Sequence, residues 1–284
     1  MVRARKSLGQ NFLVDRNYQQ RIVAALEAGP EDTVLEIGPG TGALTDHLAG
    51  AVRRLVAVEK DDALAAALEQ RFAGRADVEI VNGDALAVDL VALLGSPGDA
   101  RIIGNIPYNI TSPLIFRMLE REHRPRRLVF MVQKEVADRI VSPPGDRQYG
   151  ALSVGVRTVA QVERLFVVPR GAFRPVPNVD SAVLRIDPFR PSPLTAADER
   201  DVRTLARVAF GWRRKQLQRI LRDAPEYGLD ADAVAALLAP FEISPAARPE
   251  TLAPEDFVAL ARALRARGLP GDTSVGMDAR QESV

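Results

Sequence analysis

The 284-residue sequence contains no cysteine and only two histidines, His47 and His123. Without cysteine the chain can form neither disulfides nor thiolate metal sites, and it has no cysteine nucleophile. Two histidines offer little for a histidine-based metal centre, so we expect no metal cofactor. The sequence also lacks an apolar run of the roughly 18 residues that a membrane-spanning helix needs. Its basic start, residues 1–15, is not followed by the apolar segment of a secretory signal. These absences predict a cytoplasmic protein with neither a metal nor a membrane partner.

The charge of the chain is small in sum but unevenly distributed. The net charge is only +1, yet residues 200–222 contain eight Lys or Arg residues and a single acid, Asp201. Residues 121–127, "REHRPRR", form a second basic cluster. One basic run alone is better explained as a solvated helix face. Two clusters together with the basic N-terminus favour a polyanionic partner, because fixed positive fields attract phosphate chains.

Short apolar runs rich in β-branched residues alternate with helical patterns from about residue 20 to 187. The runs are TVLEI (33–37), RLVAVE (54–59), VEIVN (78–82), ARIIGN (100–105) and RLVFMVQ (127–133). This alternation predicts a doubly wound α/β fold with a parallel, Rossmann-like sheet. Two later runs, VERLFVV and SAVLRI, are joined by a proline-rich segment and predict a hairpin-like pair of strands at one edge of the sheet.

A domain boundary is indicated where prolines cluster, in "DPFRPSPLTAADE" (187–199). Thr195 is suited to cap the helix that follows, and only helical patterns lie beyond it. We therefore predict an α/β domain at 1–188 and a small all-helical domain at 189–268. Residues 269–284 show no hydrophobic periodicity and are predicted to be a disordered tail.

A glycine-rich turn follows the first predicted strand, with Gly38, Gly40 and Gly42 placed before a helix. Glycines let the backbone approach a ligand closely, and the helix N-terminus offers free N–H groups. The G-x-G-x-G spacing, with Glu36 just before it, differs from the G-x-G-x-x-G fingerprint of dinucleotide sites. It resembles the first motif of doubly wound S-adenosylmethionine-dependent methyltransferases, although a tight strand-helix connection alone would also produce it.

Two acidic residues lie at the ends of the next two predicted strands. Glu59 ends the second strand, where a carboxylate can accept the ribose hydroxyls of a nucleotide. Asp84 follows the third, where it can accept the exocyclic amine of adenine. Each acid alone fits a solvated strand end. Their shared position at the carboxyl edge of the sheet, beside the glycine turn, favours a nucleotide-type cofactor.

The fourth strand runs directly into "GNIPYNI", residues 104–110. The side-chain oxygen of Asn105 and a neighbouring backbone carbonyl are two acceptors that suit the two hydrogens of an amine. Such acceptors would hold adenine N6 in line with a sulfonium methyl group, so positioning and electrostatics would carry the catalysis without a strong base. Tyr108 is predicted to stack on an extruded base. The alternative is a strand-terminating turn with Tyr108 packed beneath it.

Several separated segments together resemble one family. They are "KSLGQNFLVD", "EIGPGTGALT", "VEKD", "GDAL", "GNIPYNITSPLIF", "MVQKEVADRI", "QYGALSV", "PRGAFRPVPNVDSAV", "RRKQL" and "ISPAARPETL". They are similar to the adenine N6,N6-dimethyltransferases of small-subunit ribosomal RNA. That family is linked to subunit maturation and kasugamycin sensitivity. The resemblance covers about residues 3–265 and implies a class I methyltransferase fold with S-adenosylmethionine as cofactor.

The resemblance also implies roles for individual residues. Asn11 and Leu13 match positions that cover the methionine and ribose part of the cofactor. Without the resemblance, Phe12 and its neighbours would be read as the segment that precedes a helix, with Phe12 anchored in the core. The cofactor contacts of the family correspond here to Gly38, Glu59, Asp84 and Asn105. Asn105 is shared with the target amine, Tyr108 matches the stacking aromatic, and Phe173 matches a second aromatic that flanks the target base. Without the resemblance, Phe173 would be assigned to the core. Ile106 stands where members often have leucine, which leaves its backbone carbonyl unaffected.

The partner that the resemblance implies is small-subunit ribosomal RNA within a pre-assembled subunit, docked through its phosphate backbone by the helical domain. We expect the protein to act as a monomer. One alternative is the large-subunit adenine N6-methyltransferase of the macrolide-resistance type, which shares the glycine, Asn-Pro-Tyr and proline-rich motifs. "QYGALSV" and "ARPETL" favour the small-subunit enzyme. A second alternative is a nucleic-acid-binding factor that uses the fold without chemistry, which would leave an intact set of site residues unused.

Overall fold

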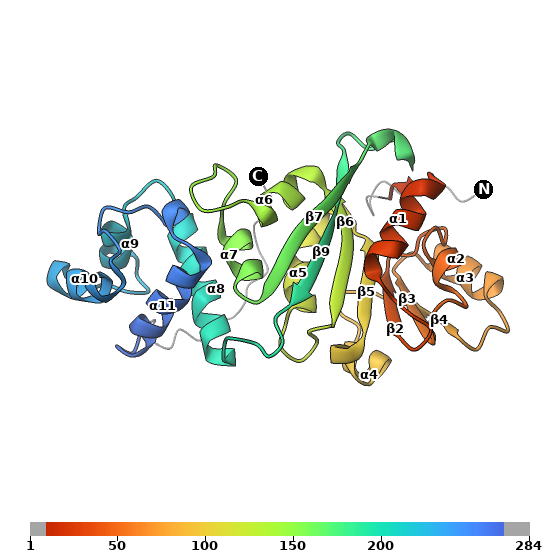
Figure 1. Cartoon of the computed structure of the whole chain (residues 1–284), viewed down its shortest axis with the longest axis horizontal. Coiled ribbons are helices and arrows are strands. Elements are labelled where there is room, and N and C mark those ends of the chain that lie inside the picture. The colour runs from red at the N-terminus through yellow and green to blue at the C-terminus, as the bar shows by residue number, and fades with distance from the viewer. Residues whose placement is uncertain (1–9, 270–284) are drawn as a thin grey trace. The chain divides into compact units, whose positions relative to one another are not determined.

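The computed structural model describes residues 10–269, and these fall into two compact units that divide between Leu194 and Thr195 (Figure 1). The basic residues 1–9 and residues 270–284 of the predicted tail lie outside the described part of the chain. None of the helices described for residues 10–269 has the length and apolar character that crossing a membrane requires.

The first unit is built on a seven-stranded sheet in the order β4-β3-β2-β5-β6-β9-β7. Its strands are β2 (Thr33–Ile37), β3 (Arg54–Glu59), β4 (Val78–Asn82), β5 (Arg101–Asn105), β6 (Arg127–Gln133), β7 (Ala160–Val168) and β9 (Ser181–Pro188). Neighbours among β2 to β6 pair in parallel, whereas β9 is antiparallel to both β6 and β7. This confirms the predicted doubly wound α/β fold. The two late strands do pair, with β7 at the edge and β9 between it and β6.

Helices connect the strands of this unit. They are α1 (Arg16–Leu26), α2 (Thr45–Leu48), α3 (Asp62–Arg71), α4 (Leu90–Leu94), α5 (Thr111–Met118), α6 (Lys134–Val141) and α7 (Ala151–Arg157). Aspartate side chains cap α1, α3 and α4, because Asp15, Asp61 and Asp89 each accept backbone N–H groups of the first turn. Such caps satisfy donors that the helix itself leaves unpaired.

The central strands are buried on both faces, which explains why they read as continuous apolar runs. Val34, Leu35, Val56, Ile103 and Val129 have no exposed surface. At Gly104 of β5, a Cβ would lie 2.6 Å from the carbonyl oxygen of Ile37, so only glycine allows this approach to β2. The close approach of β5 to β2 sets the spacing between the glycine turn and the Asn-Ile-Pro-Tyr segment.

A small ribbon that the sequence did not predict joins two distant segments. β1 (Phe12–Leu13) pairs antiparallel with β8 (Phe173–Arg174), with Phe12 opposite Arg174 and Leu13 opposite Phe173. The backbone N–H of Val14 extends this contact by donating to the Ala172 carbonyl at 2.9 Å. The ribbon fixes the N-terminal segment against the proline-rich loop between β7 and β9.

Between residues 195 and 269, the second unit contains four α-helices: α8 (Ala196–Gly211), α9 (Leu217–Asp223), α10 (Ala231–Leu238) and α11 (Pro254–Arg265). Thr195 caps α8, since its side chain accepts the N–H of Asp198. The Asp198 carboxylate is buried and lies 2.8 Å from Arg262 and 2.6 Å from Arg265 of α11. These hydrogen bonds hold the pKa of Asp198 well below its usual range, and the buried ion pair ties α8 to α11.

Candidate active site

A pocket opens at the carboxyl ends of β2, β3, β4 and β5, where the strand order reverses between β2 and β5. Open α/β sheets bind ligands at such a switch point. Seven of the eight residues predicted from the sequence line this single pocket: Asn11, Leu13, Gly38, Glu59, Asp84, Asn105 and Tyr108. Phe173 is not among the lining residues. The fold thus brings together side chains from five separate segments of the sequence.

The glycine turn after β2 depends on backbone conformations that favour glycine. The φ angles of Gly38, Gly40 and Gly42 are 65°, 60° and 86°. A Cβ on Gly40 would also lie 3.1 Å from the ring of Phe12, which lines the pocket. The N–H of Gly38 donates to the Val58 carbonyl at 2.9 Å, which joins the turn to β3. A side chain at Gly40 would therefore strain the turn and displace a wall of the pocket.

Glu59, the last residue of β3, holds the glycine turn. One carboxylate oxygen accepts the N–H of Gly40 at 2.9 Å, and the other accepts the N–H of Asp61 at 2.8 Å. Burial raises the pKa of Glu59, while these backbone hydrogen bonds oppose the shift. Each carboxylate oxygen has a second lone pair, so Glu59 can accept ribose hydroxyls while it holds the turn.

Asp84 follows β4 and is kept charged by its neighbours. Its carboxylate accepts a hydrogen bond from Lys60 Nζ at 2.7 Å and another from the N–H of Leu86 at 2.9 Å. These two contacts, the Lys60 bond foremost, lower the pKa of Asp84. Lys60 lines the pocket but was not predicted from the sequence. The remaining lone pairs of Asp84 are suited to the amine of an adenine ring.

Glu36, which precedes the glycine turn, is a buried acid in the pocket wall. It is 1% exposed, and the Thr45 hydroxyl donates to one of its carboxylate oxygens at 2.7 Å. Burial raises the pKa of Glu36 to about 8. Near neutral pH this side chain is therefore mainly a neutral acid beneath the glycine turn.

Asn105, at the end of β5, is oriented by the N-terminal segment. Its amide nitrogen donates to the backbone carbonyl of Asn11 at 2.9 Å, which leaves the amide oxygen as an acceptor at the pocket. The carbonyl of Pro107 accepts the Ile110 N–H and the Thr111 hydroxyl, at 3.2 and 3.3 Å. The carbonyl of Ile106 is then the natural second acceptor beside Asn105, which gives the pair that an amine requires.

Tyr108 begins a short 3-10 turn, η3 (Tyr108–Ile110), and its ring is fixed by a hydrogen bond. Its hydroxyl lies 3.1 Å from the hydroxyl of Ser181, the fully buried first residue of β9. Burial raises the pKa of Tyr108, so the phenol stays neutral. Ser181 was missed as a site residue, although it stands in the "PNVDSAV" segment that contributed to the family resemblance.

The N-terminal segment is tied across the pocket at three points. Gln10 donates to the Asp61 carboxylate at 3.1 Å, beside the cap of α3. Gln19 donates to the Leu13 carbonyl at 2.9 Å, and His47 lies 3.2 Å from the Gln19 side-chain oxygen. With the bond from Asn105 to Asn11, these contacts place Asn11 and Leu13 in the wall of the pocket, and their contact with a cofactor stays a prediction.

Phe173 is placed in the core and not at the pocket. Its side chain is 1% exposed and belongs to a cluster that includes Leu13, Val168 and Ala172. A buried ring in this position packs β8 against the sheet. Its role beside the target base stays a prediction, and that role would require the ring to leave the cluster.

The basic cluster at 121–127 is largely used inside the fold. Arg124 is 8% exposed and its guanidinium donates to the Leu119 carbonyl. Arg127 pairs with Asp187 at 2.7 Å and with Glu27 at 2.6 Å. These two arginines are therefore engaged within the fold, so they add little to a basic surface for a polyanionic partner. In the 200–222 stretch, by contrast, Arg203, Arg214, Lys215 and Arg222 are exposed.

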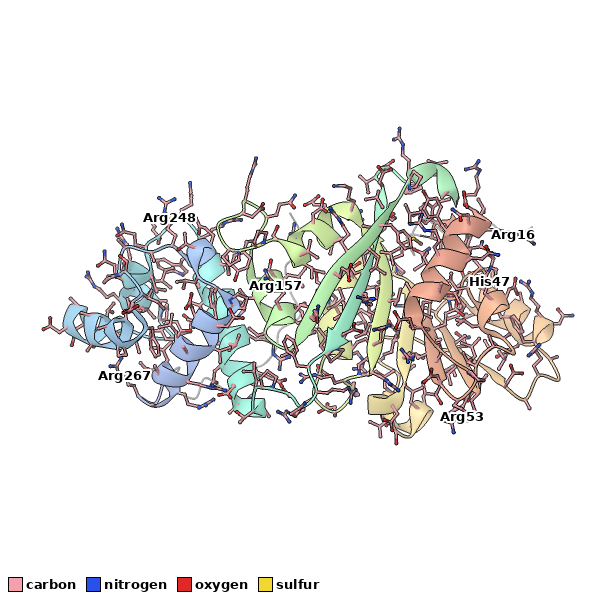
Figure 2. The ribbon with its side chains drawn as sticks, viewed as in Figure 1. Arg16, His47, Arg53, Arg157, Arg248 and Arg267 are labelled. Atoms are coloured by element: carbon pink, nitrogen blue, oxygen red, sulfur yellow. The ribbon has the colours of Figure 1, made fainter. Side chains whose placement is uncertain are left out.

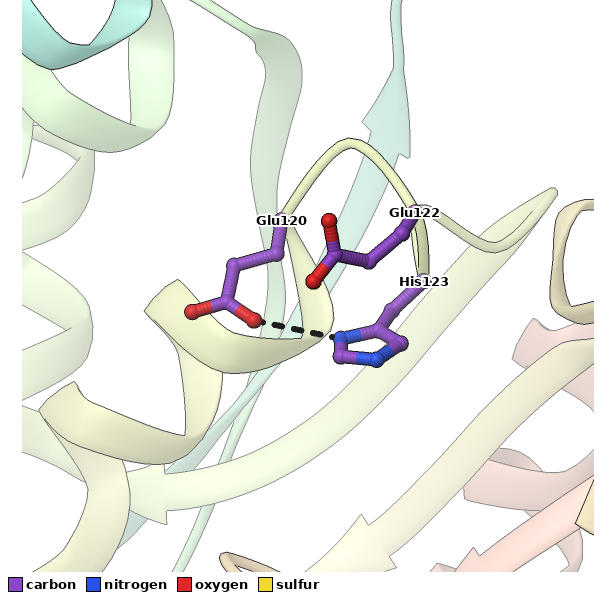
Figure 3. A group of neighbouring side chains, drawn as sticks. All are labelled: Glu120, Glu122 and His123. Atoms are coloured by element: carbon purple, nitrogen blue, oxygen red, sulfur yellow. Dashed lines mark ion pairs between the residues drawn. The ribbon is translucent and has the colours of Figure 1, made fainter. Parts of the chain in front are cut away.

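A cluster of possible metal ligands lies elsewhere in the first unit. Glu120, Glu122 and His123 have ligand atoms within 4.8 Å of one another (Figure 3). His123 Nδ1 is 3.2 Å from Glu120 Oε2 and 3.3 Å from the carbonyl of Arg117. None of the three lines the pocket. The cluster follows α5 and takes no part in the chemistry described below.

Comparison with known families and proteins places the chain among enzymes that modify ribosomal RNA. Residues 1–259 match the model of the family described as ribosomal RNA adenine dimethylase. The chain is 45% identical over 269 residues to ribosomal RNA small subunit methyltransferase A of Geobacter metallireducens, covering 94% of this chain and 98% of that protein. It is 49% identical over 266 residues to the protein of the same name from Nitratidesulfovibrio vulgaris, covering 92% of this chain and 97% of that protein.

Two solved structures share this architecture. A dimethyladenosine transferase from Plasmodium falciparum has a TM-score of 0.79 and 26% identity, with 91% of this chain and 98% of that chain covered. The 23S rRNA methyltransferase ErmE has a TM-score of 0.69 and 30% identity, with 90% of this chain and 100% of that chain covered.

Proposed function

The chain belongs to the ribosomal RNA adenine dimethylase family, and we propose that it dimethylates N6 of two adjacent adenosines near the 3′ end of small-subunit ribosomal RNA. The observation that carries the chemistry is the orientation of Asn105, whose amide nitrogen is held by the Asn11 carbonyl. The identity of 45% and 49% to small subunit methyltransferases favours the small subunit over the large, since identity to ErmE is 30%.

S-adenosylmethionine, when bound, supplies an electrophilic methyl group on a sulfonium. The lining of the pocket fits this cofactor. Glu59 accepts the ribose hydroxyls, and Asp84 accepts the amine of the cofactor adenine. The turn at Gly38 and Gly40 lets the backbone approach closely, because neither residue carries a Cβ. Asn11 and Leu13 cover the ribose and methionine part from the N-terminal side.

The residues at the end of β5 present the target. The Asn105 amide oxygen and the Ile106 carbonyl accept the two N6 hydrogens, which directs the nitrogen toward the methyl group. Tyr108, anchored through Ser181, stacks on the extruded base. Methyl transfer would form the nitrogen–carbon bond as the carbon–sulfur bond breaks, with S-adenosylhomocysteine as the leaving group. The methylated nitrogen would then be strongly acidic and would lose its proton to solvent without a dedicated base. Positioning and electrostatic matching carry the rate enhancement.

The helical unit supplies docking to the RNA. Its exposed residues Arg203, Arg214, Lys215 and Arg222 present a basic surface that suits a phosphate backbone. We take the substrate to be RNA folded within a pre-assembled small subunit and the enzyme to act as a monomer in the cytoplasm, without a metal.

The experiment that tests this proposal is methyl transfer from labelled S-adenosylmethionine to separated small and large subunits that lack adenine dimethylation. Mass spectrometry of the nucleosides should find N6,N6-dimethyladenosine only in small-subunit RNA. Label in large-subunit RNA alone would make the protein a resistance-type enzyme. Cofactor binding without label in either subunit would make it a non-catalytic binding factor.

A further inference from the structure

The loop between β7 and β9, residues 169–180, borders the pocket, and we call it the rim loop. It contains the turn η4 (Arg170–Ala172) and the strand β8, which pairs with β1. Both residues of β1, Phe12 and Leu13, line the pocket. The rim loop is thus separated from the pocket by one strand, β1.

The register of the β1–β8 ribbon determines which way its side chains face. Directly opposed residues of an antiparallel pair share a face, with Cβ atoms about 5 Å apart. Leu13 and Phe173 are opposed and both are buried, so their face points into the core. Phe12 and Arg174 are opposed on the other face, and Phe12 packs over Gly40. Arg174 therefore stands beside Phe12 at the mouth of the pocket.

Exposed cations gather around the rim loop. Arg170, Arg174 and Arg16 are exposed, and within residues 10–269 none of them forms an ion pair. Arg174 donates one guanidinium nitrogen to the carbonyls of Gly171 and Phe173, at 3.1 and 2.8 Å. Its other donors are available to a ligand. Arg16 begins α1 (Figure 2), next to Asp15, whose N–H lies 3.4 Å from the Ala172 carbonyl.

Apolar side chains are exposed at the same place. Six large hydrophobic side chains are exposed among residues 10–269, and four of them lie in the rim loop or in segments joined to it: Val14, Val167, Val176 and Val179. Val176 and Val179 are 52% and 44% exposed. A single strand offers phosphates to cations and unstacked bases to apolar surface, so guanidinium groups beside exposed apolar side chains suit such a strand.

We propose that the rim loop binds the single-stranded RNA that flanks the target adenosine, with Arg174 and Arg170 on its phosphates and Val176 and Val179 beneath its bases. This inference rests on the proposed function. Extruding a base from its neighbours requires the adjoining backbone to be held, and arginine can grip a phosphate with two parallel hydrogen bonds. Arg174 is a positioning residue for the substrate and touches no reacting atom.

The test compares an Arg170→Ala/Arg174→Ala variant with the wild type and with Arg53→Ala/Arg75→Ala. The control removes two exposed arginines that precede β3 and β4, at the amino ends of the strands and away from the pocket. Binding of each protein to unmethylated small subunits is measured across salt concentrations, together with KM and kcat for methyl transfer. Calorimetric affinity for S-adenosylmethionine and thermal unfolding verify that each variant is folded.

We expect the rim-loop variant to raise KM by about 10-fold. The plot of log affinity against log salt concentration should become less steep by about 1 to 2, because each lost phosphate contact removes about 0.7 to 0.9 from the magnitude of its slope. Arg174→Lys should keep the slope, because it keeps the charge; a purely structural role of the guanidinium would not produce this rescue. Cofactor affinity and the values for the control should match those of the wild type.

An unchanged salt slope and KM in the double alanine variant would overturn the rim-loop proposal while leaving the function intact. Weaker subunit binding with an unchanged slope would overturn it too, since that result indicates contact with a protein and not with phosphate. Failure of the proposed function is recognised separately, because the wild type itself would then form no dimethyladenosine.

Discussion

Single side chains in the pocket are fixed by partners that come from distant parts of the chain. Tyr108 is anchored by Ser181 and Asn105 by the Asn11 carbonyl, so neither side chain has to be ordered by the substrate. Preorganisation of this kind lowers the cost of reaching the reactive geometry. It also makes the contribution of each partner measurable by removing one hydrogen bond.

Removing the anchor of Tyr108 should slow methyl transfer modestly. Ser181→Ala and Tyr108→Phe each delete one hydrogen bond of about 0.5 to 1.5 kcal/mol, so we expect kcat to fall roughly 2- to 10-fold. Tyr108→Ala should cost more, because base stacking contributes about 1 to 3 kcal/mol. Steady-state kinetics with small subunits and calorimetric cofactor titrations measure both effects. A Tyr108→Ala variant with wild-type kcat and KM would remove the stacking role.

Glu36 makes the stability of the fold depend on pH. Its folded pKa, about 8, lies above the ordinary value of 4.5, so the folded state binds the proton more tightly. The stabilisation is complete below about pH 4.5 and is lost as the pH rises through about 8. Glu36→Gln mimics the neutral acid and should flatten this dependence. Urea unfolding at pH 5.5 and 8.5 measures it.

The control for Glu36 is Glu69→Gln, which removes an exposed glutamate of α3. We expect the stability of this control to fall between the two pH values as the wild type does. If Glu36→Gln lost as much stability as the wild type over that range, the buried acid could not be the group that titrates.

At the scale of elements, the glycine turn between β2 and α2 connects the cofactor site to β3 and to β1. Gly40→Ala combines a left-handed backbone with a contact of 3.1 Å to the Phe12 ring. Left-handed backbone costs about 1 to 2 kcal/mol for a residue with a Cβ, and the displaced ring adds to this. We expect cofactor affinity to fall at least about 10-fold in calorimetry.

Gly74→Ala is the matched control for this element. Gly74 also has a positive φ, of 84°, but a Cβ there would meet nothing within 4 Å. The Gly74→Ala variant should be less stable to unfolding than the wild type but should bind the cofactor with the same affinity. Equal loss of affinity in both variants would show that backbone strain, and not the pocket wall, controls binding.

Elements with a continuous local signal were predictable, and elements made by distant pairing were not. The five parallel strands were identified because burial on both faces requires unbroken apolar runs. The β1–β8 ribbon has only two residues in each strand and no pattern of its own, so the use of the Asn11 carbonyl by Asn105 could not be foreseen. For the same reason the sequence could not tell that Arg124 and Arg127 have their partners within the fold. The burial of Phe173 agrees with the core position that its own segment indicates, and only the family resemblance placed this ring beside the target base.

For the whole molecule, the helical unit should contribute affinity for RNA and not chemistry. Arg214→Ala/Lys215→Ala removes two exposed cations from the basic stretch at 200–222. We expect weaker subunit binding and a salt slope reduced by about 1 to 2, with kcat unchanged at saturating subunits. The control Arg248→Ala/Arg267→Ala removes two exposed arginines from elsewhere in the same unit (Figure 2). If subunit binding by the two variants depended on salt equally, Arg214 and Lys215 would belong to an ordinary solvated surface.

The decisive measurement is the single-turnover rate of methyl transfer to unmethylated small subunits by wild-type protein and by Asn105→Ala, both saturated with S-adenosylmethionine. The wild type should form N6,N6-dimethyladenosine. Asn105→Ala should react at least about 100-fold more slowly while still binding the subunit, since one preorganised polar group at a reacting centre contributes about that much. Dimethyladenosine formed by Asn105→Ala at the wild-type rate would contradict the assignment of Asn105 as the acceptor that presents the target amine.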